Sequence, residues 1–138
     1  MSVSRRQLAM LLSAIAPAAA QQQGSLPTRV YKWEDLPVRE RGENRQRAIL
    51  DGKTGKDFPI EIHETELAPG LAPHGSHSHI HDEILIVREG SLESVIKGKT
   101  ETLTTGSLAY IRGGEEHGFR NAGQTMARYY ILALGPKK

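Results

Sequence analysis

Cysteine is absent from this chain of 138 residues. Disulfide bonds, thiolate metal sites and cysteine nucleophiles are therefore excluded, so stability has to come from a buried core, a bound metal ion or a subunit interface. A run of apolar residues long enough to cross a bilayer is also missing. The apolar stretch at residues 8–20 is interrupted by Pro17 and is shorter than the roughly 20 residues that a spanning helix needs. We expect no membrane span in the mature protein.

An excess of charge of one sign is missing as well. The chain has 18 basic and 16 acidic residues, and the difference is due to Arg5 and Arg6 near the start. The remaining lysines and arginines are scattered singly, without a clustered basic face or interleaved aromatic residues. This distribution argues against a nucleic-acid partner.

The first twenty residues have the pattern of a targeting segment. Residues 4–8 read Ser-Arg-Arg-Gln-Leu, a start of the twin-arginine type, and residues 18–20 are three alanines, typical of a cleavage site. We predict a signal peptide at residues 1–20 and export to the periplasm or the exterior of a bacterium, with the general secretory route as the alternative. Twin-arginine export of a folded chain would favour weakly binding metals loaded in the cytoplasm, such as Fe²⁺ or Mn²⁺.

Short strands separated by glycine turns are expected over most of the remaining chain. Residues 21–44 are predicted to form a tether with an edge strand at 30–33 and a loop at 38–45, and residues 45–138 a single domain. Strands are expected at residues 46–50, 60–67, 83–88, 92–96, 100–103, 108–111, 117–120 and 126–134, with a turn at 51–56. This pattern is typical of an antiparallel all-β sandwich or barrel.

Five of the six histidines lie between positions 74 and 117. Residues two apart on a strand point to the same side, so His77 and His79 can direct their imidazoles at one point. Glu83 begins the next apolar strand, and His117 lies on a later one, so both could reach the same point. Three imidazoles and one carboxylate suit a divalent metal ion. A second set, in which His79 and His81 join His117, remains open at this stage.

The spacing of these residues resembles the two sequence motifs of the cupin superfamily. The first motif corresponds to His77, one residue, His79, three residues, Glu83, six residues and Gly90. The second corresponds to Gly106, five residues, Arg112, one residue, Gly114, two residues, His117, three residues and Asn121. The segment between the motifs has 15 residues, as is typical of small microbial cupins.

Two positions depart from the family pattern. Gly70 lies one position earlier than the usual glycine before the first motif, and Arg112 stands where members usually carry proline. Proline would fix the backbone before Gly114, so a looser or differently shaped turn is expected here. No ligand position is lost.

The resemblance implies a jelly-roll barrel, or double-stranded β-helix, with one metal ion inside, and commonly a homodimer. It favours His77, His79, Glu83 and His117 as ligands, because this set places the carboxylate at the family's spacing. Fe²⁺ or Mn²⁺ is favoured, with Ni²⁺, Zn²⁺ or Cu²⁺ as alternatives. The implied function is a small-molecule metalloenzyme, either dioxygenase-like or isomerase- or decarboxylase-like. The alternatives are a non-catalytic ligand-binding or metal-binding cupin and a structural dimeric barrel.

Further candidates surround these ligands. Glu83 is the candidate catalytic proton acceptor, while His81 and Arg112 are candidates for the barrel mouth. The strand at residues 126–134 has two faces, and if the even-numbered face lines the cavity, Arg128 and Tyr130 could hold an anionic or carbonyl oxygen. His63 is expected at the surface or rim. The apolar residues at 84 and 86 point away from the ligand face and indicate a second sheet or a subunit interface.

Overall fold

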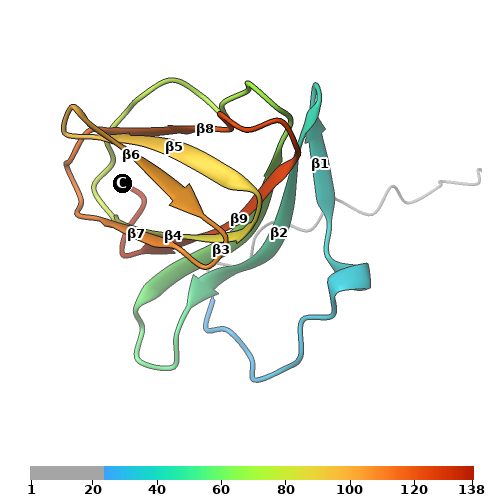
Figure 1. The fold of residues 1–138 in the computed structure, drawn as a ribbon. Coiled ribbons are helices and arrows are strands. Elements are labelled where there is room, and N and C mark those ends of the chain that lie inside the picture. The colour runs from blue at the N-terminus through green and yellow to red at the C-terminus, as the bar shows by residue number, and fades with distance from the viewer. Residues whose placement is uncertain (1–23) are drawn as a thin grey trace, which may run out of the picture.

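The computed structural model describes residues 24–138, which form an almost purely antiparallel β-structure (Figure 1). The predicted signal peptide at residues 1–20 lies outside this part. A single turn of 3₁₀ helix (Trp33–Asp35) precedes the strands. These are β1 (Val38–Arg41), β2 (Asn44–Lys53), β3 (Pro59–Leu67), β4 (Asp82–Glu89), β5 (Ser91–Ile96), β6 (Lys99–Thr104), β7 (Leu108–Ile111), β8 (His117–Arg120) and β9 (Ala127–Leu134).

The strands form two sheets that face each other (Figure 1). One sheet has the order β1-β2-β3-β9-β4-β7, and the other has the order β6-β5-β8. The chain changes sheet after β4, β6, β7 and β8, so strands far apart in the sequence become neighbours. This arrangement confirms the expected all-β barrel. Within residues 24–138, no helix is long and apolar enough to cross a bilayer.

The core lies between the two sheets. Strand β9 runs between β3 and β4, and its odd-numbered side chains, from Ala127 to Ala133, are buried. They face Leu92, Leu103 and Phe119 of the smaller sheet, which are also buried. Burying each large apolar side chain contributes about 1.5–3 kcal/mol, so this cluster is the main source of stability.

Strand β4 carries the core and the candidate site on one face. Glu83, Leu85 and Val87 alternate along the strand and are all buried, while Ile84 and Ile86 lie on the opposite face. Because side chains alternate across a strand, the register that buries Leu85 also turns Glu83 into the barrel. The apolar core thus fixes the direction of the candidate metal ligand.

The N-terminal strand lies later in the chain than predicted. Residues 30–33 form no strand, and β1 lies within the segment that was expected to be a loop. All four residues of β1 are exposed, so the strand lacks the apolar alternation by which strands are recognised. Its pairing with β2 and the turn at Gly42, which has a φ of 63°, define it instead. The turn expected from residue 51 begins after Lys53, because β2 continues past a bulge.

Candidate metal centre

The two histidine motifs meet through a backbone bridge. His77 donates its N–H to the carbonyl of His117 at 3.0 Å, and His117 returns the same hydrogen bond at 2.9 Å. This bridge ties the loop before β4 to the first residue of β8. The imidazole rings lie side by side, with their centroids 4.8 Å apart. Residues 40 positions apart in sequence are therefore held as immediate neighbours.

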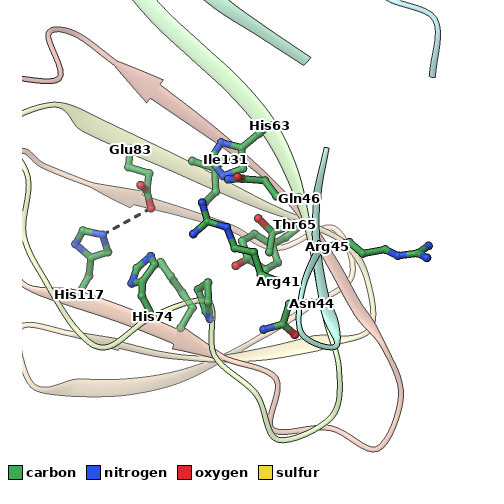
Figure 2. Close-up of a pocket in the computed structure, with 13 residues that line it drawn as sticks. Arg41, Asn44, Arg45, Gln46, His63, Thr65, His74, Glu83, His117 and Ile131 are labelled. Atoms are coloured by element: carbon green, nitrogen blue, oxygen red, sulfur yellow. Dashed lines mark ion pairs between the residues drawn. The ribbon is translucent and has the colours of Figure 1, made fainter. Parts of the chain in front are cut away.

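Glu83 lies between two of the imidazoles. One carboxylate oxygen is 3.1 Å from Nε2 of His79, and the other is 3.7 Å from Nε2 of His117. Figure 2 marks the pair formed by Glu83 and His117 inside the cavity. His117 is 1% exposed and Glu83 is 8% exposed, so water has little access to these atoms. His77, His79 and His117 also form a cluster whose ligand atoms lie within 4.8 Å of one another.

Backbone carbonyls fix the orientation of two rings. Nδ1 of His79 lies 2.9 Å from the carbonyl of His81, and Nδ1 of His117 lies 2.9 Å from the carbonyl of Glu115. A carbonyl only accepts, so each Nδ1 carries the proton and each Nε2 of a neutral ring is left with a lone pair. Carbonyl groups commonly orient metal-binding histidines in this way.

The resulting lone pairs require a positive charge between them. Nε2 of neutral His79 and the carboxylate of Glu83 are both acceptors, and 3.1 Å is too close for two acceptors without a proton or cation. Nε2 of His117 is buried and has no hydrogen-bond partner among residues 24–138. A buried polar atom without a partner is costly. Nitrogen and carboxylate donors are of the type that suits a divalent transition metal, so the residues fit such an ion.

The ring of His81 packs against one of the candidate ligands, His79. Its ring stacks on that of His79 with a centroid separation of 3.7 Å and an angle of 8°. Burial lowers the pKa of His81, and the nearby His79 lowers it further. His81 groups with His79 and Glu83 as possible ligands, whereas the alternative set with His117 is not among the clusters found in the described residues. Burial also lowers the pKa of His77, which favours the neutral form that a metal ligand needs.

A turn from the second motif holds the segment that carries these ligands. Gly114 donates its N–H to the carbonyl of His79 at 2.7 Å, and Gly113 donates to the carboxylate of Asp82 at 2.8 Å. This Gly113 N–H, with a smaller contribution from the Tyr110 hydroxyl, lowers the pKa of Asp82. The turn closes without proline, because Glu115 donates to the carbonyl of Arg112. The side chain of Arg112 is exposed and is not part of the cavity lining.

The cavity beside the ligands has a volume of about 160 Å³. Glu83, His117, Tyr129 and Ile131 are among the residues that line it, and Figure 2 shows Glu83 beside His117. This space is smaller than the roughly 300–1,000 Å³ of pockets for drug-sized ligands, so it suits a small molecule. Burial raises the pKa of Tyr129, and this phenol stays neutral.

The structure places the odd-numbered face of β9 inside the barrel. Arg128 and Tyr130, predicted to line the cavity if the other face turned inward, are absent from its lining. Arg128 instead forms ion pairs with Glu66 and Glu89 on the outer face. Sequence alternation identifies the two faces of a strand but does not tell which is inside. Here the small residues at 127 and 133 pack against the core.

A second group of polar residues lines the same cavity, and most of these residues were not predicted from the sequence. His63, expected at the rim, lies half-buried in the cavity wall and contacts Glu61 at 3.2 Å. The hydrogen bond from His63, with help from Lys137, lowers the pKa of Glu61 to about 2. Arg41 and Gln46 come from the hairpin β1–β2, which was not predicted. The Gly42 turn beside Arg41 was the available signal for it.

Comparisons with known proteins agree with this architecture. The family model for the cupin domain matches residues 63–133. This region is just over half of the chain, spans both motifs and contains all the candidate ligands. The chain belongs to the cupin domain family. No curated protein sequence matches it.

Solved structures show the same fold. An RmlC-like cupin from Shewanella frigidimarina is 15% identical with a TM-score of 0.66, over 78% of this chain and 90% of that chain. A predicted oxalate decarboxylase from Thermotoga maritima is 19% identical with a TM-score of 0.67, over 78% and 100%. A cupin 2 conserved barrel domain protein from Salinispora arenicola is 24% identical with a TM-score of 0.58, over 70% and 80%. At such identities the similarity establishes the fold, not the activity.

Proposed function

We propose that this cupin binds one divalent metal ion through His77, His79, Glu83 and His117, and that it is a metal-dependent enzyme acting on a small molecule. The observation that carries the proposal is the contact between Glu83 and His79, where the lone pair on Nε2 of a neutral imidazole would lie 3.1 Å from the carboxylate. A cation between them removes their repulsion and also gives the buried Nε2 of His117 a partner. Fe²⁺ or Mn²⁺ is the proposed ion.

The chemistry depends on what reaches the cavity. A bound divalent ion would supply Lewis-acid polarisation of a substrate oxygen and, with Fe²⁺ or Mn²⁺, access to dioxygen chemistry. Glu83 is the proposed proton acceptor, because its carboxylate borders both the ligand cluster and the cavity. Neutral Tyr129 and apolar Ile131 limit water around the substrate. The proposed reaction is dioxygenase-like, or an isomerisation or decarboxylation.

Turnover by metal-loaded protein tests the catalytic proposal. Oxygen uptake and substrate loss should be followed with catechols, flavonols, sugars and keto acids, using protein loaded with Fe²⁺ or Mn²⁺. We expect turnover of at least one class by the wild type and none by His117→Ala. A control is Lys99→Ala, at an exposed position of β6 that is not part of the cavity lining. Equal rates for wild type and His117→Ala would contradict the proposal.

A non-catalytic binding protein is the second candidate, supported by the small cavity, which would hold a ligand even if the site did not transform it. Ligand binding without turnover of any tested class would favour this alternative. A purely structural barrel would retain neither property, and metal would only add to its folding stability.

The proposal extends to assembly and location. A homodimer is supported by the outer face of the larger sheet, where Leu108 and Tyr110 are 57% and 53% exposed. These two residues continue the apolar row begun by Ile84 and Ile86 on the neighbouring strand.

Export to the periplasm or beyond is supported by the twin-arginine-like start of the sequence alone. Immunoblotting of cell fractions would test export.

A further inference from the structure

The cavity wall opposite the metal ligands holds an arginine that the proposed metal site does not use. Arg41, the last residue of β1, lines the cavity. Figure 2 shows its guanidinium turned into the cavity, on the side that Glu83 and His74 face. Within residues 24–138, no carboxylate lies within ion-pair distance of Arg41, whereas Arg45 on the same hairpin pairs with Glu40.

The hairpin that carries Arg41 is fastened to the loop before the histidine motif. Arg41 pairs in register with Asn44 across the Gly42 turn. The Asn44 side chain accepts a hydrogen bond from the N–H of Ala68 at 3.2 Å and donates one to the carbonyl of Ala72 at 3.4 Å. These bonds hold the end of the hairpin against the cavity, so they fix the backbone from which the exposed Arg41 side chain extends.

Arg45 on the same hairpin provides a contrast. It also borders the cavity, but Figure 2 shows its guanidinium pointing away from it. Its charge is paired with Glu40 at 2.9 Å. The chain therefore turns one arginine of the hairpin outward with a partner and the other inward without one.

The charges around the cavity favour the binding of an anionic ligand. Glu83 is the carboxylate of the ligand cluster, whereas Glu61 is already occupied by His63 and by Lys137 at 2.8 Å. With a divalent cation and the fixed charge of Arg41, the cavity would have a net positive charge. An arginine fork matches a carboxylate in geometry, and charge-assisted hydrogen bonds are stronger than neutral ones.

We propose that Arg41 is a substrate-binding residue and that the natural ligand carries a carboxylate, held by Arg41 while its other oxygen atoms face the metal ligands. This inference rests on the proposed metal site and names the substrate class for it. The small cavity restricts the ligand to a short carboxylic acid. The role differs from that predicted for Arg112 and Arg128, which do not line the cavity.

Calorimetric titration with glycolate and its neutral amide, glycolamide, tests the proposal. The protein is loaded with redox-inert Zn²⁺, and its zinc content is measured separately. Wild type should bind glycolate, and Arg41→Gln should weaken that binding roughly tenfold or more, the effect of one charged hydrogen bond. Glycolamide binding should be the same in both proteins. Arg41→Lys should retain part of the glycolate affinity.

Arg45→Gln is the matched control and should leave both affinities unchanged. Equal glycolate affinity in wild type and Arg41→Gln would overturn the inference, as would an equal loss for glycolamide or for Arg45→Gln. Failure of the protein to take up zinc would count against the proposed metal site. In that case the same titrations of metal-free protein decide the role of Arg41. A loss of affinity that is seen only for glycolate and only in Arg41→Gln would support the role of Arg41. Equal glycolate affinity in wild type and Arg41→Gln, or no glycolate binding at all, would overturn it.

Discussion

The carboxylate of Glu83 is the residue on which the candidate site depends most. It is buried on β4 and borders both His79 and His117. The backbone carbonyls at His81 and Glu115 set both rings so that their Nε2 atoms face this carboxylate. Neither ring could accept a hydrogen from Glu83 unless the carboxyl group were protonated. With both rings neutral, the arrangement fits ligands around the proposed cation.

Glu83→Gln should therefore lower metal affinity by at least tenfold, because the amide keeps the shape but loses the charge. Competition with a coloured chelator measures this affinity. Glu115→Gln is the matched control, since only the backbone carbonyl of Glu115 orients His117 and its side chain pairs with Lys97. Unchanged affinity in Glu83→Gln would remove Glu83 from the ligand set.

The stability of the fold should depend on pH through the ionisation of Glu61. Its pKa is held at about 2, below the ordinary value of 4.5, chiefly by the hydrogen bond from His63. A lowered carboxyl pKa stabilises the fold above pH 4.5, and this contribution is lost as the pH falls towards 2. Glu61→Gln should cost on the order of 1–2 kcal/mol at neutral pH.

Urea unfolding at a series of pH values tests this expectation. The difference in unfolding free energy between wild type and Glu61→Gln should be constant from neutral pH down to about pH 5 and then shrink. A difference that grows as the pH falls would have the wrong sign for a lowered pKa.

The candidate ligands could be named from the sequence, and their role stays a prediction, whereas most of the residues around them could not be named. The spacing of His77, His79 and Glu83 places three potential ligands on two adjacent segments. The inward face of β9 depends on which side meets the smaller sheet, so the sequence left open whether Arg128 lines the cavity, and in the structure it does not. The direction of Arg41 depends on a hairpin held by Asn44, a contact between distant residues that no local pattern records.

At the scale of the elements, the turn at residues 113–114 contacts the segment that carries the candidate ligands. A Cβ atom on Gly113 would lie 2.2 Å from the carbonyl oxygen of Ile80. The segment from His79 to Glu83 packs directly on this glycine, so a side chain there must displace it. Because Gly113 has no side chain, its backbone can lie against that of Ile80. This contact positions the segment that carries the candidate ligands His79 and Glu83.

Gly113→Ala should consequently weaken metal binding by roughly tenfold or more while the barrel still folds. The measurements are chelator competition for the metal and circular dichroism for the fold. Gly75→Ala in the ligand loop is the control, because its Cβ would meet nothing within 4 Å. A Gly113→Ala protein with wild-type affinity would mean that the turn is not needed to position the ligands.

Strands that have one buried face could be predicted from the sequence, whereas the exposed strand β1 could not. Strand β9 alternates between buried and less buried residues along its whole length, and β4 does so up to Val87. Both strands were expected within one residue of their ends. The exposed strand β1 has no such pattern. Trp33, expected on a strand, instead lies in a 3₁₀ turn and packs against the guanidinium of Arg47, 4.2 Å from its ring centroid.

At the scale of the whole molecule, the larger sheet has one face in the core and an outer face that is partly apolar. Ile84 pairs with Leu132 and Tyr110, and Ile86 pairs with Tyr130 and Leu108, so apolar side chains run across three strands. Contiguous apolar surface of this kind usually marks an interface. It is the surface on which the proposed homodimer would form.

Leu108→Asp should convert this dimer to a monomer without unfolding it, because the side chain is exposed and its loss leaves the core intact. Sedimentation velocity measures the assembly state. Phe58→Asp, at another exposed apolar position, should remain dimeric. A wild type that sediments as a monomer, or a Leu108→Asp protein that stays dimeric, would reject this surface as the interface.

The central claim is a single divalent metal ion held by three histidines and one glutamate. Elemental analysis of protein purified anaerobically and without an affinity tag tests it most directly. We predict about one iron or manganese per chain in the wild type and none in His117→Ala. Wild-type protein that contains no metal, even after incubation with Fe²⁺ or Mn²⁺, would contradict the claim.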